Sequence, residues 1–499
     1  STVSGNIARY GGGIYSASNP ELINVFVGNN VAFAGGGMYN DGAAVTSDDA
    51  ALTNVTFSGN WAEQDGGGMV SVNGNPRLEN VTFLGNTADN GPGGGLYNFN
   101  TKSGIAPMRL TDVTFEGNVA LNGGGGMYND LGDNLALTNI TFSGNVSTTT
   151  GGGMYNRDGS PTLTNVTFFA NTTVTQGGGM YNKGGSPTQK NLTFAYNSAN
   201  QGGGIYNSTN SNPVILNTIL WANPGAGGAQ IYNDATSTPM VSDSIIEGGY
   251  AGGSFIITAD PKLGTFGDHG GFTDTLSILP GSSAIDSGWD ADCATTDQRE
   301  VIRPQGPHCD IGAYEFVATF ADVPTDYWAW QFVERLYNYG VTGGCGGGNY
   351  CPSQNVTRAQ MAVFLLKSKY GTSYSPPPAS GAVFGDVPSD HWAAAWIEEL
   401  YMQSITSGCG NNNFCPDTLV TRDQMAVFLL RAKYGYTYYP PPATGVFADV
   451  PAGHWAAPWI EQLASEGITG GCGGGNYCPE GVVSRGQMAV FLVAAFGLP

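Results

Sequence analysis

The fold is decided by a short stretch, Leu52-Thr53-Asn54-Val55-Thr56-Phe57, which recurs with small variations along the first half of the chain. Val55 and Phe57 share one face of an extended segment, whereas Asn54 and Thr56 share the other, and this alternation predicts a β-strand. One such strand is too short to bury a core by itself. Coils stacked about 4.8 Å apart would instead place Phe on Phe and Val on Val in a continuous interior.

The stretch runs into a Phe-x-x-Asn motif, which marks the period of the repeat. Successive phenylalanines of the motif lie 31, 26, 32, 27, 26 and 26 residues apart, and this period indicates a solenoid rather than a globular core. The longer steps carry extra polar residues, such as those at 41–50, and predict loops that bulge from one side. The motif occupies residues 26–29, 57–60, 83–86, 115–118, 142–145, 168–171 and 194–197.

A second motif alternates with the first and consists of Gly-Gly-Gly, an aliphatic residue and usually Tyr-Asn. Glycine lets the backbone turn a tight corner with positive φ, where a larger residue would collide with the next coil. The Asn after each Phe tolerates a left-handed backbone and is expected to hydrogen-bond along a ladder of identical amides. The aliphatic-Tyr-Asn triplets lie at 38–40, 96–98, 127–129, 154–156, 180–182 and 205–207.

Together the two motifs resemble the FxxN and GGxI-like repeats of the chlamydial polymorphic outer-membrane proteins, over about residues 1–250. The resemblance implies a mainly β fold in which these residues form a right-handed parallel β-helix. It implies no particular activity, because function depends on sites rather than on the fold that carries them.

Residues 251–318 are predicted to form a cap on the β-helix. Their motifs at 260–264, 279–288 and 309–315 resemble the closing module of secreted bacterial β-helix proteins of the choice-of-anchor kind. A last coil has open strand edges and an exposed apolar end, which a cap would cover. At the other end, Val3-Ser4-Gly5-Asn6 matches the second half of a Phe-x-x-Asn unit, so either upstream coils were removed or another molecule completes the first coil head to tail.

From residue 319 the composition shifts to Trp, Tyr, Ala and helix formers, and a shorter unit follows in three copies. Each copy opens with Phe-x-Asp-Val-Pro, and a Trp lies eight positions after each Phe. Pro-Pro-Pro linkers separate the copies and predict stiff extended spacers. The expected domains are therefore the β-helix, the cap and three helical domains, at residues 1–250, 251–318, 319–378, 379–442 and 443–499.

Two helices are predicted in each helical copy. In the first copy, Trp328, Phe332, Val333 and Leu336 have helical spacing and predict one amphipathic helix. The second helix begins after a capping box, in which a Ser or Thr side chain and a Gln three residues later satisfy backbone N–H groups. The predicted boxes pair Thr357 with Gln360, Thr421 with Gln424 and Ser484 with Gln487.

The three copies resemble S-layer homology (SLH) domains over about residues 319–499, through the FxDVP opening, a His-Trp-Ala segment, a Gly-Ile-Thr-Gly turn and a Thr-Arg helix start. The resemblance implies a pseudo-threefold cluster whose grooves between domains bind cell-wall polysaccharide, often through an acidic pyruvyl group. The Thr-Arg-Ala-Glu motif of the family maps its Arg onto Arg358, Arg422 and Arg485. Gln replaces the Glu of that motif in every copy, which keeps the cap but alters the charge pattern.

Matching residues of the three copies are the candidates for a site that binds polysaccharide or a neighbouring subunit. An Arg at a helix N-terminus adds a cation to free backbone donors and suits a sugar carboxylate, although each Arg can also simply pack or pair at the surface. Core packing is favoured over sugar stacking for the Trp residues, and the Asp of each FxDVP is expected to fix the turn before the first helix. The candidates are Arg358, Arg422, Arg485, Trp328, Trp392 and Trp455, and the turn residues are Asp322, Asp386 and Asp449.

The eight cysteines fall into four local pairs, one in the cap and one in each helical copy. Local disulfides are favoured, and they require an oxidising compartment. Zinc is the rival interpretation, but the spacing is not Cys-x-x-Cys and no His lies within the loops. The expected pairs are Cys293 with Cys309, Cys345 with Cys351, Cys409 with Cys415 and Cys472 with Cys478.

An enzyme or a metal site has little support in the repeats. Residues 1–268 contain no His, and no pair of carboxylates recurs on one strand face beside a base. We therefore predict no catalytic residue and no cofactor. Loop carboxylates are candidates for structural calcium, although solvated acidic loops are the favoured interpretation. These carboxylates belong to Asp48, Asp49, Asp286, Asp290 and Asp292.

Charge and hydropathy restrict the partners. The formal net charge is −21, so the surface repels phosphate backbones and nucleic acid is excluded as a partner. No run of eighteen apolar residues is present to span a membrane as a helix, and Ser1 indicates a processed chain whose export signal has been removed.

These observations predict a secreted, non-enzymatic structural protein of the cell surface. It is expected to assemble with itself as a subunit of an S-layer, sheath or extracellular filament, with the helical cluster anchored to wall polysaccharide or to neighbouring subunits. The alternatives are an adhesin anchored to the wall and, less favoured, a polysaccharide lyase or hydrolase on a β-helix scaffold.

Overall fold

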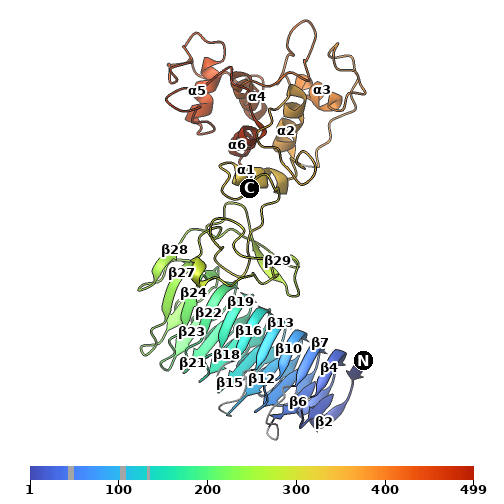
Figure 1. The fold of residues 1–499 in the computed structure, drawn as a ribbon, viewed down its shortest axis with the longest axis vertical. Helices are drawn as coiled ribbons and strands as arrows, with labels where there is room; N and C mark the ends of the chain where they lie inside the picture. The colour runs from blue at the N-terminus through green and yellow to red at the C-terminus, as the bar shows by residue number, and fades with distance from the viewer. Residues whose placement is uncertain (19, 43–49, 102–107, 132–134, 372, 499) are drawn as a thin grey trace. The chain divides into compact units, whose positions relative to one another are not determined.

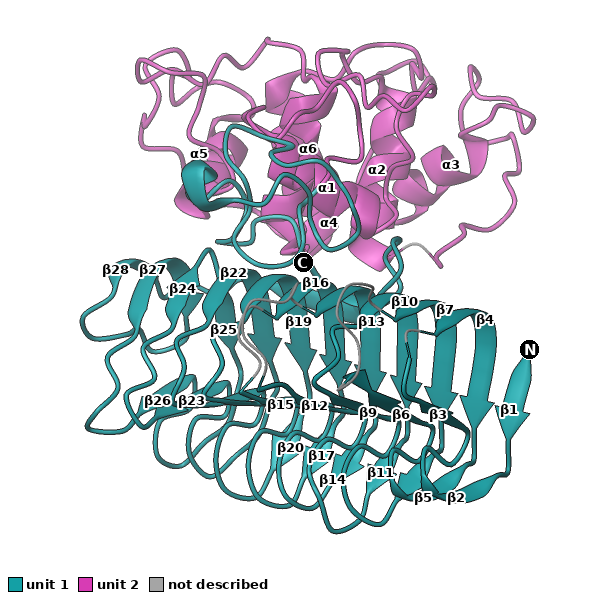
Figure 2. Ribbon diagram, turned by 60° about the horizontal axis from the view of Figure 1, so that its bottom comes forward, with its two compact units in different colours: residues 1–316 teal, residues 317–499 magenta. Residues whose placement is uncertain are grey.

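The chain forms two compact units, residues 1–316 and residues 317–499 (Figures 1 and 2). The structure is a computed structural model, and it describes residues 1–498 except 19, 43–49, 102–107, 132–134 and 372. Unit 1 is a parallel β-solenoid with a long segment folded onto it, and unit 2 is helical. The mainly β fold class is thus confirmed, and most of the loop expected at 41–50 lies outside the described residues.

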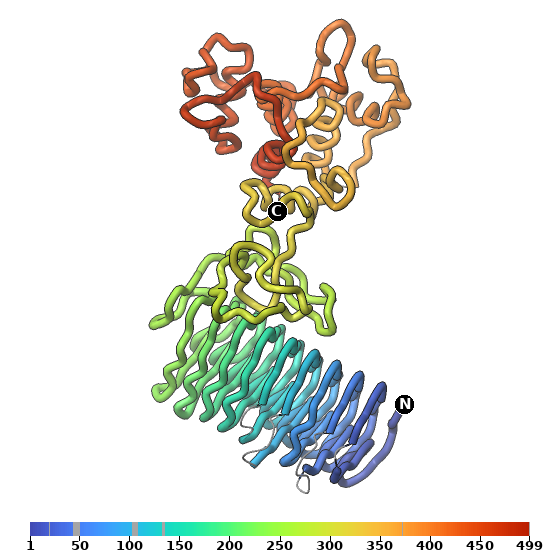
Figure 3. Tube along the Cα trace, in the orientation of Figure 1, coloured from blue at the N-terminus to red at the C-terminus, as the bar shows by residue number. Residues whose placement is uncertain are grey.

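The solenoid contains three parallel sheets, with one strand of each in a regular coil, and the second sheet ends at β20 while the other two continue through later coils. The stacked coils can be followed in Figure 3. The first sheet contains β1 (Thr2–Ser4), β4 (Glu21–Gly28), β7 (Ala51–Ser58), β10 (Arg77–Leu84), β13 (Arg109–Glu116), β16 (Ala136–Ser143), β19 (Thr162–Phe169), β22 (Thr188–Ala195), β24 (Val214–Leu216), β25 (Ile219–Trp221), β27 (Met240–Ile246) and β28 (Ser254–Ile257). The second contains β2 (Ile7–Tyr10), β5 (Val31–Ala34), β8 (Trp61–Ala62), β11 (Thr87–Ala88), β14 (Val119–Ala120), β17 (Val146–Ser147) and β20 (Thr172–Thr173). The third contains β3 (Ile14–Ser16), β6 (Met38–Asp41), β9 (Met69–Val72), β12 (Leu96–Phe99), β15 (Met127–Asp130), β18 (Met154–Arg157), β21 (Met180–Lys183), β23 (Ile205–Ser208) and β26 (Ile231–Asn233).

Stacked phenylalanines form the centre of the solenoid core, as predicted. Neighbouring rings are nearly parallel, with centroids 4.5–5.0 Å apart, and each of these side chains is fully buried. Identical residues therefore contact each other from coil to coil, which makes the interior continuous. The stack contains Phe57, Phe83, Phe115, Phe142, Phe168 and Phe194.

The simple alternation predicted for these strands is interrupted at one position. Asn54 has φ +55°, in the left-handed region, and the same conformation recurs in the following coils. The bend turns both Leu52 and Val55 into the core, although they lie three residues apart. Asn accepts this conformation more readily than most residues, which explains its presence in the middle of the strand.

A ladder of buried Asn side chains confirms the role expected for the Asn of Phe-x-x-Asn. Asn86 donates from Nδ2 to Oδ1 of Asn118 at 3.0 Å and to the carbonyl oxygen of Phe57 at 2.9 Å. Its backbone N–H also donates to Asn118 Oδ1 at 2.9 Å. Each amide is therefore satisfied by the neighbouring coils. The ladder comprises Asn30, Asn60, Asn86, Asn118, Asn145, Asn171, Asn197 and Asn223.

The first Phe-x-x-Asn copy is a false match. In the pairing of β4 with β7, Val27 rather than Phe26 lies opposite Phe57. Phe26 points outward and is 39% exposed, while Asn30 takes the ladder position predicted for Asn29. A shift of one residue exchanges the two faces of a strand, so the motif alone identifies the wrong register here.

The glycine triplets make the predicted corners. Gly93, the first of one triplet, has φ +72°, and a Cβ on the next residue, Gly94, would lie 2.4 Å from the carbonyl oxygen of Gly125. No side chain fits at that distance. The tyrosines that follow the triplets stack on the outside of the solenoid, with centroids 4.4–5.1 Å apart from Tyr128 to Tyr232.

The segment predicted as an end cap lies mainly along the flank of the solenoid. Only β28 extends the last coil, by pairing with β27. The remainder forms a hairpin of β29 (Leu263–Gly267) and β30 (Thr275–Ile278), a short 3₁₀ helix η2 (Asp290–Asp292) and loops. Gln298 hydrogen-bonds Thr141 and Thr167 at 2.7 Å each, so the segment returns to the outer face of β16 and β19. The repeat sets identical Thr and Asn groups on that face, and the returning loops pair with them.

Unit 2 is a ring of three helix pairs. Its backbone centre is a cycle of three hydrogen bonds, in which Val356 donates to Val483, Val483 to Val420 and Val420 to Val356, at 2.9–3.0 Å. All three valines are fully buried, so the copies share one core around a pseudo-threefold centre. The helices are α1 (Trp330–Asn338), α2 (Arg358–Tyr370), α3 (Ala394–Met402), α4 (Arg422–Tyr434), α5 (Ala457–Ser465) and α6 (Arg485–Phe496).

Two of the three predicted capping boxes are present, at the starts of α2 and α6. The third is not formed, because Thr421 donates its hydroxyl to the carboxylate of Asp423 and accepts nothing from Gln424. Gln424 N donates to that same carboxylate at 2.7 Å, so Asp423 takes over part of the capping.

Candidate functional site

The three candidate arginines join neighbouring copies of unit 2. Each is only 4–5% exposed, and each Nε donates to a backbone carbonyl of the next copy in the ring. Arg358 reaches Phe414, Arg422 reaches Tyr477 and Arg485 reaches Tyr350, at 2.7–2.8 Å. The alternative that these arginines simply pack or pair at the surface is therefore wrong. Burial lowers the pKa of each guanidinium, but an Arg side chain remains charged in proteins.

Aromatic rings on both sides stabilise these buried cations. The guanidinium of Arg485 lies 4.6 Å from the ring centroid of Tyr350 and 5.4 Å from that of Phe364. The other two copies repeat the arrangement. Cation–π attraction offsets part of the desolvation of a buried cation. Sequence reasoning missed these rings, whose signal is an aromatic residue directly before the second Cys of each copy, at Tyr350, Phe414 and Tyr477.

The three guanidinium groups differ in their free donors. Nη2 of Arg422 donates to the carbonyl oxygen of Gly471 at 3.1 Å. Nη2 of Arg358 and of Arg485 is buried and has no hydrogen-bond partner among the described residues. A buried unpaired N–H group costs free energy until it finds an acceptor, so these two positions favour an incoming acceptor such as a carboxylate.

The candidate tryptophans are exposed, so the core-packing interpretation was wrong. Trp328, Trp392 and Trp455 are 60%, 63% and 58% exposed. The predicted first helix also begins too early. Helix α1 starts at Trp330, and Trp328 lies in the turn before it. Val333 and Leu336 carry the buried face of α1 instead. An exposed indole offers a large apolar ring together with one polar N–H group.

One of the candidate arginines and one of the candidate tryptophans line a pocket of about 370 Å³ beside α4. Arg358 comes from the start of α2, Thr406 from the loop after α3, and Trp455 from the third copy. The pocket therefore combines a buried cation, hydroxyl groups and an aromatic face contributed by all three copies. Its other lining residues include Gln424, Phe428 and Arg431.

Asp423 distinguishes the groove that holds the pocket beside α4 from the equivalent grooves between the other copies. Its carboxylate accepts a hydrogen bond from Trp455 Nε1 at 3.1 Å and lies 3.8 Å from His454 Nε2. The equivalent positions carry Ala359 and Gly486, neither of which can hold an indole in this way. A Cβ at Gly486 would lie 3.0 Å from the Tyr327 hydroxyl, so a larger residue there would have to displace that side chain slightly.

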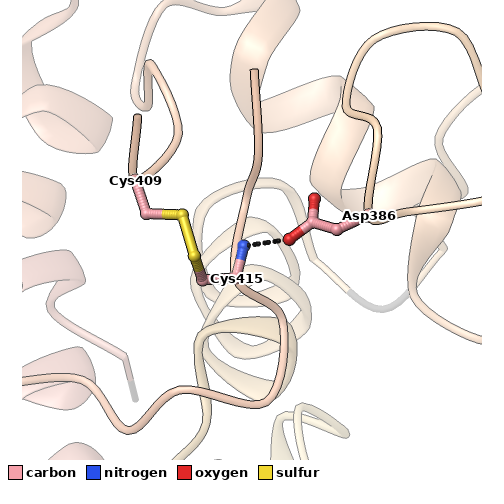
Figure 4. A group of neighbouring side chains, drawn as sticks. All are labelled: Asp386, Cys409 and Cys415. Carbon is pink, nitrogen blue, oxygen red and sulfur yellow. Dashed lines mark hydrogen bonds between the residues drawn. A yellow bond between two sulfur atoms is a disulfide. The ribbon is translucent and has the colours of Figure 1, made fainter. Parts of the chain in front are cut away.

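The Asp residues of FxDVP brace the disulfide loops rather than only the turn before the first helix. Asp386 accepts from the backbone N–H groups of Phe414 and Cys415 at 2.7 Å each, and Figure 4 shows the bond from Cys415. Asp322 and Asp449 make the same pair of bonds in the other copies. Each carboxylate thereby satisfies two donors of the loop that positions the aromatic ring beside the Arg.

All four predicted disulfides are present, Cys293–Cys309, Cys345–Cys351, Cys409–Cys415 and Cys472–Cys478. Asp386, Cys409 and Cys415 lie close enough to hold a metal ion, as does the equivalent group in the third copy. Both thiols are consumed by the disulfide, as Figure 4 shows, and the carboxylate accepts backbone donors, so this group does not fit a metal.

The carboxylates considered for calcium are engaged with protein donors where they are described. Asp290 accepts from His308 Nδ1 at 2.9 Å and from the backbone of Cys309 at 3.0 Å. Asp292 pairs with Lys190 at 3.2 Å, and Asp286 accepts from the backbone of His308 at 3.4 Å. These contacts tie the flank segment together. Asp48 and Asp49 lie outside the described residues.

Three segments of unit 2 match the S-layer homology domain, at residues 319–362, 383–426 and 446–489. A segment of the solenoid, residues 191–208, matches the repeat of the Chlamydia polymorphic membrane proteins. The chain thus carries three SLH domains after a β-solenoid that contains a polymorphic-membrane-protein repeat.

Curated relatives share about a third of the chain. A "Cell surface protein" of Thermoanaerobacter kivui is 30% identical over 190 residues, which are 38% of this chain and 23% of that protein. An amylopullulanase of Thermoanaerobacterium thermosulfurigenes is 30% identical over 183 residues, 36% of this chain and 10% of the enzyme. An S-layer protein of Bacillus licheniformis is 27% identical over 175 residues, 35% of this chain and 19% of that protein. The chain covers less than a quarter of the length of each of these three relatives.

The SLH domains and the cell-surface and S-layer relatives identify a surface-anchored protein located outside the cell. Within the described residues, no helix has the length and apolar character that crossing a bilayer requires.

Proposed function

We propose that this chain is a non-enzymatic structural protein of the cell surface, in which the SLH cluster binds wall polysaccharide and the solenoid assembles with other copies into a layer, sheath or filament. The observation that carries the anchoring part is the pocket beside α4, which is lined both by buried Arg358, whose Nη2 has no hydrogen-bond partner among the described residues, and by exposed Trp455. Because the relatives include an amylopullulanase, the non-enzymatic role rests on the repeats themselves, which present the same residue types coil after coil.

The chemistry of the pocket suits an acidic sugar. A guanidinium group binds a carboxylate through charge-assisted hydrogen bonds. Because Nη2 of Arg358 has no acceptor among the described residues, a carboxylate that reached it would supply one. The apolar face of Trp455 can cover a sugar ring while its edge stays in water. The loop hydroxyl groups of Thr406 and Ser407 add hydrogen-bonding partners at the same pocket.

The anchoring proposal is tested with the exposed tryptophans, because the arginines also hold the copies together. Replacing Trp328, Trp392 and Trp455 with Ala should leave the fold intact and reduce retention on cell-wall sacculi at least about tenfold. Sacculi from which the attached polysaccharide has been removed should retain neither protein. Equal retention of the triple variant and the unmodified chain would exclude these grooves as the anchor.

Two observations support self-assembly. The outer faces of the solenoid repeat the same side chains at constant register, which offers a regular surface to a second copy. One side also exposes apolar residues, which favour association when covered. They are Val119, Leu121, Val146 and Val174.

Electron microscopy of the purified chain tests assembly separately from anchoring. Regular polymers are expected from both the unmodified chain and the triple tryptophan variant, because the solenoid surface carries the contact. Single rods at all concentrations would exclude the structural subunit and favour the adhesin. Release of reducing sugar from wall polysaccharide by the full chain would overturn the non-enzymatic role.

A further inference from the structure

A second pocket, of about 420 Å³, adjoins the one beside α4, and we call the two the outer and the inner pocket. They share three lining residues, Thr406, Ser407 and Arg431, so a ligand can pass from one to the other across the Arg431 side chain. The remaining lining residues of the outer pocket are Tyr401, Met402, Ser404, Tyr436 and Tyr439.

The outer pocket has the chemistry of a saccharide subsite. Tyr401, Tyr436 and Tyr439 are 45%, 62% and 78% exposed, so three amphipathic rings face solvent around one hollow. Tyr offers a broad contact area with little loss of side-chain entropy, and its hydroxyl group can hydrogen-bond sugar hydroxyls. Nε of Arg431 is buried and has no hydrogen-bond partner in the described part of the chain. An acceptor on the ligand would satisfy it.

The features of the outer pocket belong to the second copy specifically. Arg431 corresponds to Lys367 in the first copy and to Ala494 in the third, counted from the Arg that starts each helix. Counted in the same way, Tyr436 and Tyr439 correspond to Thr372 and Ser375 of the first copy. The SLH fold therefore does not require Arg431, Tyr436 and Tyr439. Their presence around one pocket indicates a function specific to the second copy.

We propose that the outer pocket is a second subsite, which binds the sugar unit next to the one held at Arg358 in an acidic wall polysaccharide. The inference rests on the proposed anchoring function. The neighbouring unit stacks on Tyr436 and Tyr439, and an oxygen of its acidic or hydroxyl substituent accepts from Arg431. The groove beside α4 consequently holds two consecutive sugar units and distinguishes longer chains from shorter ones.

The test compares fragments of different length with the full protein. Wall polysaccharide of the producing strain is cut into fragments of one sugar unit and of two or more units, and affinities are measured by calorimetry. The variant Y436T/Y439S installs the residues of the first copy in an exposed loop. It should bind single units as the unmodified chain does, and bind longer fragments about five- to tenfold more weakly.

Three further measurements separate the two proposals. Trp455→Ala should weaken binding of fragments of every length, because it alters the inner pocket. Tyr196→Ser, which changes another exposed tyrosine (50%) in unit 1, should leave binding of every fragment unchanged. Equal binding of longer fragments by Y436T/Y439S and by the unmodified chain would overturn the second subsite alone. Failure of the unmodified chain to bind any fragment would overturn the anchoring function and the subsite with it.

Discussion

The two units use repetition in opposite ways. In unit 1 each coil contacts a neighbour with the same motif, and the motif side chains, such as Phe142 and Asn145, contact their counterparts in the next coil. In unit 2 the copies close into a ring, and each Arg contacts different elements of the next copy. Similarity from coil to coil produces a regular solenoid, whereas differences between ring copies, at positions 423 and 431, give the groove beside α4 side chains that the other copies lack.

The difference also sets what a single substitution does. A change in one coil damages the same contact twice, with the coil before and the coil after, but leaves distant coils unaltered. A change at one joint of the ring opens a closed cycle and exposes a core shared by three copies.

Phe142→Ala should have the largest effect, because it leaves a cavity between two rings whose centroids lie 4.7 Å from its own. We expect the free energy of unfolding of unit 1 to fall by about 3–5 kcal/mol. Denaturant titration followed by circular dichroism measures the change. Phe26→Ala is the matched control and should cost less than about 1 kcal/mol, since Phe26 lies outside the stack. Equal losses would contradict the register described for the first Phe-x-x-Asn copy.

Arg485→Ala should destabilise unit 2 by about 2–3 kcal/mol, because it leaves the carbonyl oxygen of Tyr350 without its donor and removes two cation–π contacts. Thermal unfolding monitored at the tryptophans of unit 2 measures it. Arg77→Ala removes an exposed ion pair with Glu79 in unit 1 and, measured by the unfolding of unit 1, should change stability by less than about 0.5 kcal/mol. If Arg485 behaves like Arg77, the arginines are not joints of the ring.

The two units should also respond oppositely to pH. Burial and the neighbouring Glu315 carboxylate raise the pKa of Asp310 well above its ordinary value. A carboxyl group of this kind favours folding when protonated, so its contribution is complete below the ordinary pKa of about 4 and is lost as the pH rises through the raised pKa. The stability of unit 1 should therefore gain this contribution on mild acidification, and Asp310→Asn should flatten the dependence.

Asp449 provides the opposite sign in unit 2. Partial burial opposes the shift, but hydrogen bonds from the backbone N–H groups of Tyr477 and Cys478 lower the pKa of Asp449. Its contribution is present above a pH of about 4 and is lost as the pH falls through the lowered pKa. Unfolding curves at several pH values for Asp310→Asn and Asp449→Asn should thus deviate from the unmodified chain in opposite directions. Deviations of the same sign would contradict either the burial described for the Asp310 carboxyl group or the backbone hydrogen bonds described for the Asp449 carboxylate.

Much of the solenoid could be predicted from the sequence, because every coil meets the same neighbours and the period itself reports them. The Phe stack, the Asn ladder and the glycine corners all follow from that rule. Phe26 was misplaced because a one-residue offset preserves the motif while reversing the face. The path of the flank segment was also missed, since the contact of Thr141 with Gln298 joins residues 157 positions apart and leaves no local pattern.

The site could be predicted only in part, for a related reason. The arginines and the disulfides recur in every copy and the capping box in two of the three, so comparison of the copies revealed them. The exposure of the tryptophans depends on contacts between copies, which no single copy encodes. Asp423 is the clearest case that comparison of the copies could not predict. The sequence predicted a third capping box, but the Thr421 hydroxyl group donates to the Asp423 carboxylate instead of accepting from Gln424.

Asp423→Ala should have the smallest effect and tests whether that departure serves the groove. Loss of the carboxylate frees Thr421 to cap α4 in the usual way, so stability should change by less than about 1 kcal/mol. Trp455 loses the acceptor of its indole N–H group, and affinity for wall polysaccharide should fall about threefold as the ring becomes less ordered.

Asp423→Asn decides between positioning and charge as the role of this residue. Its side-chain oxygen can still accept from Trp455 Nε1, so affinity should return to that of the unmodified chain if positioning matters. If the carboxylate instead acts by repelling an acidic ligand, both Asp423→Ala and Asp423→Asn should bind more tightly than the unmodified chain, most clearly at low salt. Because Ala359 occupies the same position in the first copy, Ala359→Asp should then weaken binding there, whereas positioning predicts that the new carboxylate improves it by holding Trp392.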